Sequence, residues 1–351
     1  MMIKNLQANL GENDAFLVVS PENRRYLTGF ASSDGYLLIT KKSAVFFVDS
    51  RYIEAARKQI SGCEAVLLTS LKAQLGEYIE KLSVTVLYTE AEKLSVAEFE
   101  KIKKDVICTC VSDNVDKAVN ELRRIKSDDE KKKILAAQSI AENAFDRILG
   151  FIKEGVTERD IALELDFFML RNGAEAVSFE TIAVSGSNSS MPHGVPSNKK
   201  IEKGDFITLD FGAVVDGYHS DMTRTVAYGE VSSKQAEIYE TVLAAQKKSL
   251  ESLKAGVSCK AADAAARDII ENAGYGSFFG HGTGHGVGIE IHEQPRLSPK
   301  SDSILLAGDI VTVEPGIYLP GEFGVRIEDM AFITETGCEN LTKSPKNLII
   351  L

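Results

Sequence analysis

The fold is decided by a stretch that occurs twice, GDFITLDFG at residues 204–212 and GDIVTVEPG at residues 308–316. Each copy begins with Gly-Asp, continues as an apolar strand pattern and carries one acid at the same position, Asp210 and then Glu314. A carboxylate within an apolar strand costs free energy unless it is paired or bound to a metal ion. The repeat, at an offset of 104 residues, therefore predicts two equivalent halves that each present an acid.

A second repeat lies upstream of the first, because KEGVT at 153–157 is echoed by KAGVS at 254–258. Thr157 and Ser258 can each cap the helix that follows. A long amphipathic helix precedes the first copy, with a capping box at 127–130 and apolar spacing that we expect to continue through Ile152 to Gly155. Each half is thus predicted to be helix, helix, hairpin. Lysine and arginine cluster at 123–126 and 131–133. These clusters are most simply the linker before this first helix and the solvated start of the helix.

Each repeated acid is followed by another acid on the return strand of its hairpin. Asp221 lies eleven residues after Asp210, and Glu328 lies fourteen residues after Glu314. If Asp216-Gly217 forms a two-residue turn, Asp210 lies opposite Thr223. Asp210 and Asp221 are then diagonal neighbours on one face, roughly 7–8 Å apart or less, which is close enough to share a metal ion.

The histidines gather in the same region of the chain. All five lie between residues 193 and 292, and the stretch HGTGHGVG at 281–288 places two of them among glycines. Glycine lets backbone and ligand approach closely. The stretch contains no phosphate-binding glycine motif, so it favours a cramped metal or substrate site over a nucleotide loop.

The rest of the chain adds a separate N-terminal domain. Residues 1–122 alternate apolar strand patterns, at 15–19, 36–39, 44–48 and 84–88, with polar helical stretches, which is typical of an α/β domain. A length of 351 residues is compatible with two domains, and we place the boundary between residues 122 and 123.

Composition excludes several classes of partner. The formal charge of −11 argues against binding to nucleic acid. No apolar run approaches the roughly 18 residues of a membrane span, and the start of the chain shows no signal sequence. We therefore expect a cytoplasmic protein without a membrane anchor.

These residues together resemble the pita-bread metallopeptidases, specifically the Xaa-Pro aminopeptidases and the Xaa-Pro dipeptidases (prolidases). The resemblance rests on the four acids above and His285, with Asp221 inside SDMTRT at 220–225, and on NRRYLTGF at 23–30. It implies a creatinase-like α/β domain at 1–122. It also implies an α+β pita-bread catalytic domain at 123–351, whose halves are related by an internal pseudo-two-fold repeat.

The resemblance also implies a dinuclear metal site. Carried over by position, the resemblance makes Asp210 a terminal ligand of one ion, and His285 and Glu314 ligands of the other. Asp221 and Glu328 are the expected bridges between the two ions. Four carboxylates and one imidazole suit harder ions, so we expect two Mn²⁺, with Co²⁺, Fe²⁺ or Zn²⁺ left open. Glu314 is the expected proton acceptor for the attacking water.

Other residues match positions that handle the substrate or support the ligands. His193 and His292 are expected to donate to the substrate carbonyl, and neither should bind metal. Arg296 resembles the prolidase residue that clamps a dipeptide's carboxylate. Arg326, Thr223 and His281 are expected to lie behind the ligands and orient them.

The expected function is hydrolysis of the Xaa-Pro bond in dipeptides or at the N-terminus of peptides, by a homodimer as the family implies. Methionine aminopeptidases share the five ligands but lack the long N-terminal domain. Creatinases share both domains but work without metal. Non-catalytic pita-bread binding proteins would have lost ligands, and none is lost here. Arg296 favours dipeptides over longer peptides without deciding the question.

Overall fold

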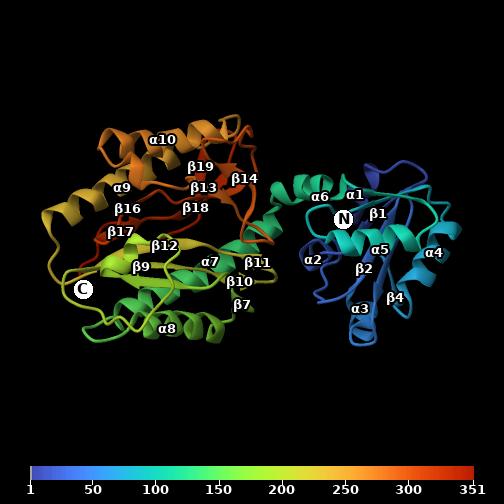
Figure 1. Cartoon of the computed structure of the whole chain (residues 1–351), viewed down its shortest axis with the longest axis horizontal. Coiled ribbons are helices and arrows are strands. Elements are labelled where there is room, and N and C mark those ends of the chain that lie inside the picture. The colour runs from blue at the N-terminus through green and yellow to red at the C-terminus, as the bar shows by residue number, and fades with distance from the viewer. Residues whose placement is uncertain (1) are drawn as a thin grey trace. The chain divides into compact units, whose positions relative to one another are not determined.

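The computed structural model describes residues 2–351 and divides between Arg123 and Arg124 into two compact units (Figure 1). Within the described residues, no helix combines the length and the apolar character that crossing a membrane requires.

The N-terminal unit is a six-stranded sheet with helices packed against it. Its elements in chain order are α1 (Met2–Ala8), β1 (Asp14–Val18), α2 (Pro21–Thr28), β2 (Tyr36–Thr40), β3 (Ala44–Val48), α3 (Ile53–Gln59), β4 (Glu64–Leu67), α4 (Leu71–Lys81), β5 (Val86–Thr89), α5 (Val96–Asp105), β6 (Thr109–Ser112) and α6 (Val115–Arg124). The strand order is β4-β3-β2-β1-β5-β6, and β2 runs antiparallel to both its neighbours.

The four strands predicted in this unit are confirmed as β1, β2, β3 and β5. They were recognisable because they are the apolar strands at the centre of the sheet, where Leu17, Phe47 and Leu87 are fully buried. The edge strands β4 and β6 were not predicted. They have only four residues each and are mostly half-buried or exposed, so they lack the apolar run that marks a central strand.

The C-terminal unit begins with the first half of the repeat. Its elements are α7 (Asp128–Leu149), α8 (Glu158–Arg171), β7 (Ala176–Val177), β8 (Ile182–Ser185), the 3₁₀ helix η1 (Gly186–Ser190), β9 (Asp205–Phe211), β10 (Ala213–Val215), β11 (Tyr218–His219) and β12 (Met222–Tyr228). The second half contains α9 (Ser233–Ser252), α10 (Cys259–Asn272), the 3₁₀ helix η2 (Gly276–Phe278), β13 (Gly284–Gly286), β14 (Glu293–Leu297), β15 (Ile310–Val313), β16 (Gly316–Leu319), β17 (Phe323–Arg326), β18 (Asp329–Ile333) and β19 (Cys338–Asn340).

The predicted order of helix, helix, hairpin is confirmed in both halves. The glycines of the upstream repeat share one left-handed conformation, with φ 85° at Gly155 and 86° at Gly256. Their amides donate to equivalent carbonyls, those of Ile201 and Leu305. Thr157 and Ser258 cap α8 and α10 as expected. The sequence repeat is therefore a structural repeat down to single hydrogen bonds.

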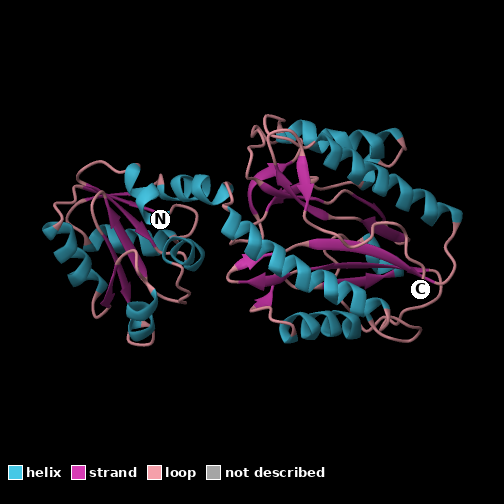
Figure 2. Ribbon diagram, turned by 180° about the vertical axis from the view of Figure 1, so that it is seen from behind, coloured by secondary structure: helices cyan, strands magenta, loops and turns pink. Residues whose placement is uncertain are grey.

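The strands of the C-terminal unit lie between two layers of helices. Helices α9 and α10 form one layer and α7 and α8 the other (Figures 1 and 2). Buried apolar residues of α7 and α8 pack against β9 and β12, and those of α9 and α10 pack against the strands of the second half. The strand ends that carry the repeated acids thereby meet in the middle of the unit.

The hairpin register is the one predicted from the sequence. Asp216 and Gly217 both have positive φ angles, 49° and 81°, as a type I′ turn requires. Val215 pairs with Tyr218 across this turn, and Asp210 pairs with Thr223 farther along.

One helix boundary was predicted wrongly. Helix α7 ends at Leu149 with Gly150 as its C-cap, and does not continue to Gly155. Glycine is a poor helix former, so the chain leaves the helix at the first glycine it meets. Ile152 is still buried, because the amides of Phe151 and Ile152 both turn back to the carbonyl of Ile148.

The turn at 216–217 gives a stability prediction. Gly217→Ala places a Cβ at φ 81° and should lower the free energy of unfolding by about 1–2 kcal/mol. Asp216→Asn, which suits a type I′ turn, is the matched control and should leave stability near the parent value. Urea unfolding of the metal-stripped protein compares them, and equal stability of the two variants would contradict the turn assignment.

Candidate functional site

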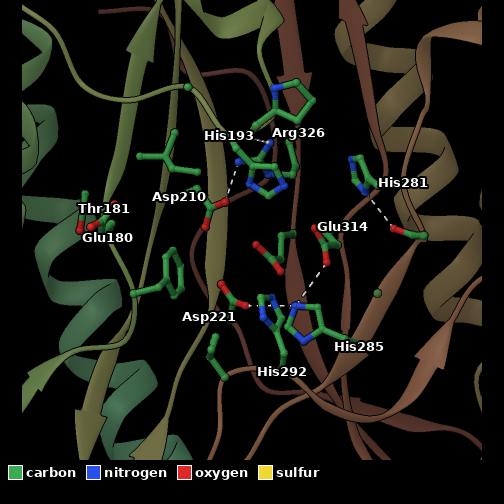
Figure 3. Close-up of a pocket in the computed structure, with 18 of the residues that line it drawn as sticks. Glu180, Thr181, His193, Asp210, Asp221, His281, His285, His292, Glu314 and Arg326 are labelled. Carbon is green, nitrogen blue, oxygen red and sulfur yellow. Dashed lines mark hydrogen bonds and ion pairs between the residues drawn. The ribbon is translucent and has the colours of Figure 1, made fainter. Parts of the chain in front are cut away.

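A cavity of about 610 Å³ lies in the C-terminal unit where the two halves meet (Figure 3). All five predicted metal ligands line its wall. So do five of the six other predicted site residues, His193, His281, His292, Arg296 and Arg326. Thr223 is fully buried behind the wall.

The first half supplies two acids from neighbouring strands. Asp210 is the next-to-last residue of β9, and Asp221 immediately precedes β12, the strand paired with β9. Asp210 Oδ2 accepts a hydrogen bond from Arg326 Nη2 at 2.6 Å. Its other oxygen, Oδ1, is buried and has no hydrogen-bond partner among residues 2–351. A buried oxygen of this kind needs a partner that the protein itself does not provide.

The second half supplies the other two acids in the same way. Glu314 follows β15, and Glu328 precedes β18, the strand paired with β15. Thr312 Oγ1 donates to Glu314 Oε1 at 3.3 Å, and Thr223 Oγ1 donates to Glu328 Oε2 at 2.6 Å. Each threonine thus orients one carboxylate, and Thr223 does so from the opposite half of the repeat.

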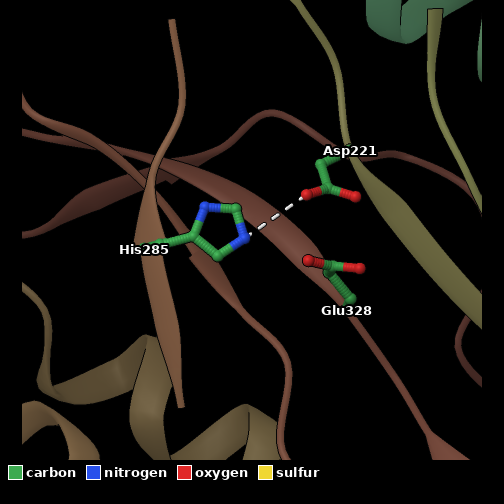
Figure 4. A group of neighbouring side chains, drawn as sticks. All are labelled: Asp221, His285 and Glu328. Atoms are coloured by element: carbon green, nitrogen blue, oxygen red, sulfur yellow. Dashed lines mark ion pairs between the residues drawn. The ribbon is translucent and has the colours of Figure 1, made fainter. Parts of the chain in front are cut away.

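The imidazole of His285 lies among these carboxylates on β13. Its Nδ1 lies 3.0 Å from the carbonyl oxygen of Gly286, which can only accept, so Nδ1 carries the proton. Nε2 then carries a lone pair and lies 3.5 Å from Asp221 Oδ2 (Figure 4) and 3.4 Å from Glu314 Oε1 (Figure 3). This is the tautomer that a metal-binding histidine adopts. The backbone at Gly284 lies so close to β15 that a Cβ would fall 1.9 Å from the carbonyl oxygen of Thr312.

The electrostatics of the cluster favour bound cations. Burial raises the pKa of Asp221 and of Glu328 well above the usual range, and neighbouring carboxylates raise both further. Burial likewise raises the pKa of Glu314 to about 8 and lowers the pKa of His285 to about 3. Four carboxylates this close cannot all ionise unless positive charge is added.

The donor set therefore fits divalent metal ions. One oxygen from each of Asp221 and Glu328 and one nitrogen of His285 lie within 4.8 Å of one another, so a single ion could bind all three. The unpartnered oxygen of Asp210 and the carboxylate of Glu314 flank this group and could complete a second position (Figure 3).

Arg326 connects the ligands to the structure behind them. Besides Asp210, its guanidinium donates to Thr223 Oγ1 at 3.1 Å and to the hydroxyl of Tyr318 at 2.9 Å. The Tyr318 hydroxyl is also 2.9 Å from His281 Nε2. His281 therefore reaches the ligands only through Tyr318 and Arg326, whereas Arg326 and Thr223 each contact one directly.

Sequence reasoning missed Thr312 and Tyr318. Thr312 had a usable signal, because threonine stands two residues before the acid in both copies of the repeat, at 208 and 312. Residues two apart in a strand share a face, so each threonine belongs beside its acid. Tyr318 lies on β16 and reaches Arg326 only through the folded hairpin, so no local pattern marks it.

His193, His292 and Arg296 also line the cavity. The His292 ring meets the His285 ring edge to face, with centroids 4.4 Å apart. His193 is exposed on the loop that follows η1 (Figure 3). The remaining lining is largely apolar and includes Phe179, Ile182, Pro192, Val195, Pro196 and Ile291. The cavity can therefore hold an apolar ring against a polar metal-binding floor.

The chain matches Metallopeptidase family M24 over residues 132–335 and the Creatinase/Prolidase N-terminal domain over residues 2–125. It is 40% identical to the Xaa-Pro dipeptidase of Pyrococcus horikoshii, over 96% of this chain and 94% of that protein.

Two solved structures resemble the whole chain. An Xaa-Pro dipeptidase from Bacillus anthracis superposes with a TM-score of 0.96 at 45% identity, covering 99% of both chains. An X-Pro aminopeptidase from Thermotoga maritima superposes with a TM-score of 0.91 at 37% identity, again covering 99% of both. These matches confirm the predicted fold, a creatinase-like domain followed by a pita-bread domain.

The raised carboxyl pKa values give a prediction for metal-free protein. Folded Glu314 keeps its proton up to a pKa of about 8, whereas its ordinary value is 4.5. The resulting stabilisation is complete below the ordinary value and is lost as pH rises through the folded value. Asp221 and Glu328 act in the same direction.

Metal-stripped protein should therefore unfold at progressively lower temperature between about pH 5 and pH 8, relative to Mn²⁺-loaded protein, in which metal replaces the protons. Thermal unfolding of both forms across this range measures the difference. If the unfolding temperatures of the two forms changed in parallel with pH, these carboxyl groups would not hold protons in the metal-free fold.

Proposed function

Because the chain belongs to metallopeptidase family M24, we propose that it hydrolyses the bond between an N-terminal residue and proline. Residues 123–351 carry this activity, and residues 1–122 form the creatinase-like domain. The observation that supports the proposal most directly is the cluster of four carboxylates around the neutral imidazole of His285, two of them buried and two half-buried, beside a largely apolar cavity.

In the proposed site these five residues would hold two divalent ions. Asp221 and Glu328 would be shared by both ions, Asp210 would serve one, and His285 and Glu314 would serve the other. When bound, such ions polarise the scissile carbonyl and lower the pKa of water. Asp210 keeps its orientation through Arg326, and Glu328 keeps its orientation through Thr223. Glu314 accepts the proton of the attacking water.

The substrate is positioned by groups on the open side of the cavity. His193 and His292 donate to the carbonyl oxygen as it becomes negative, which stabilises the transition state more than the ground state. The proline nitrogen is a tertiary amide without a hydrogen, so its ring needs only apolar contact. Phe179, Ile182 and Ile291 are available for this contact.

Arg296 is proposed to bind the free carboxylate of a dipeptide. A guanidinium can hold both oxygens of a carboxylate at once, so it favours a substrate that ends at proline. The relatives include proteins named for each activity, dipeptidase and aminopeptidase, so we propose a dipeptide-capable enzyme rather than a strict dipeptidase. Mn²⁺ as the native ion, a cytoplasmic location and a homodimer are further parts of this proposal.

The test is the initial rate of hydrolysis of Ala-Pro and Ala-Pro-Ala by metal-stripped protein, before and after Mn²⁺ is restored. Restored protein should cleave Ala-Pro at least as well as Ala-Pro-Ala, whereas stripped protein should be inactive. Asp221→Asn removes a bridging charge and should lower kcat by about a hundredfold or more, since two-metal chemistry depends on both ions.

The substrates also separate the alternatives. A clear preference for Ala-Pro-Ala would contradict the carboxylate role of Arg296 and favour an aminopeptidase. If folded, metal-loaded protein cleaves neither peptide, the proposed hydrolysis is wrong and a peptide-binding role replaces it.

A further inference from the structure

Glu293 is a buried carboxylate next to His292 that faces away from the cavity. Residues along β14 alternate, with Glu293, Pro295 and Leu297 buried and the residues between them exposed. Alternate residues of a strand point to opposite faces. His292 and Arg296 accordingly line the cavity, while the carboxylate of Glu293 lies on the other side of the same segment.

The Glu293 carboxylate holds the loop that carries His292. Its Oε1 accepts a hydrogen bond from the backbone amide of Glu290 at 3.1 Å. The loop packs against the same carboxylate at Gly288, where a Cβ would lie 2.5 Å from Oε2. Glu293 also pairs with Gly286 on β13, at the point where the loop begins. The Glu293 side chain thus holds the loop at residues 288 and 290, and its backbone pairs with the residue at which the loop begins.

The charge of Glu293 is balanced by Lys126. Lys126 Nζ lies 3.0 Å from Glu293 Oε2, and only 1% of the lysine side chain and 5% of the glutamate side chain are exposed. An ion pair this well buried interacts in a medium of low dielectric constant. Removing the lysine takes away the buried positive charge beside this carboxylate, which is unfavourable and drives local rearrangement.

Lys126 is itself firmly placed. Its backbone amide donates to the carbonyl of Gly308 at 2.9 Å. Two residues earlier, Arg124 forms an ion pair with Asp309 at 2.7 Å. Gly308 and Asp309 directly precede β15, which ends next to Glu314. The segment 124–126 therefore joins the start of a ligand-bearing strand to the loop that carries His292.

We propose that Lys126 is a positioning residue for the reaction. Its ammonium group fixes the carboxylate of Glu293, and Glu293 in turn holds residues 288–292 in the shape that directs His292 at the substrate carbonyl. Lys126 is not one of the residues that line the cavity, and among residues 2–351 its ammonium group forms an ion pair with Glu293, so the side chain acts through Glu293. The inference rests on the proposed function, because that function gives His292 its role.

The test compares Lys126→Met, Lys126→Arg and the control Lys131→Met on Ala-Pro. Lys126→Met should lower kcat about tenfold to a hundredfold, as expected for a misplaced catalytic group. Since the lost contact acts in the transition state, kcat/KM should fall equally and KM should stay constant. Lys126→Arg keeps the charge and should recover most of the activity. The control breaks a different ion pair, with Glu339, and should leave kcat unchanged.

Two measurements separate positioning from general damage. The Mn²⁺ stoichiometry of Lys126→Met should equal that of the parent protein, since no ligand is altered. Amide hydrogen exchange should be faster in residues 286–296 of this variant, with α8 unaffected. A raised KM with unchanged kcat, a loss of metal or unaltered exchange would each overturn the proposal.

The exchange comparison does not depend on catalysis. If the parent protein cleaves no Xaa-Pro peptide, the proposed function fails, yet faster exchange in 286–296 would still establish that Lys126 holds the loop. If the parent is active and exchange is faster while kcat is unchanged, the loop is held by Lys126 but its position does not matter for the reaction, which refutes the inference.

Discussion

Mutual repulsion among four carboxylates around one cavity is the constraint on which the rest of the site depends. Asp221 and Glu328 are buried, Asp210 and Glu314 are half-buried, and all four face one cavity. Burial opposes the ionisation of Asp221, Glu314 and Glu328, and neighbouring carboxylates oppose it further. Such a cluster is compatible with a stable fold only if protons or cations neutralise it. The same property that makes it costly when empty makes it a strong site for divalent ions.

The surrounding structure keeps the carboxylates apart and oriented without neutralising all of them. Arg326 contributes a buried positive charge in direct contact with a proposed ligand, Asp210. Thr223 and Thr312 contribute only hydroxyl donors to Glu328 and Glu314. Net negative charge therefore remains for metal ions to balance. The buried salt bridge between Lys126 and Glu293 lies behind the cavity and does not involve the proposed metal ligands.

The sequence was informative wherever function follows from local pattern and repetition. The offset of 104 residues paired Asp210 with Glu314, and the Asp216-Gly217 turn fixed the register of Asp210 against Thr223, which the structure confirms. The edge strands were harder to predict because their apolar patterns are weak. The end of α7 was harder to predict because it depends on the low helix propensity of glycine. Contacts such as Tyr318 with Arg326 or Lys126 with Glu293 join distant segments, so only the fold reveals them.

The central claim is that the acids and His285 form one site for two ions. Crystals soaked in Mn²⁺ and measured near the manganese absorption edge test it without reference to activity. The account predicts two anomalous peaks about 3.5–4 Å apart, both in contact with Asp221 and Glu328, one also with Asp210 and the other with His285 and Glu314. A single peak, or peaks away from Asp221 and Glu328, would contradict it.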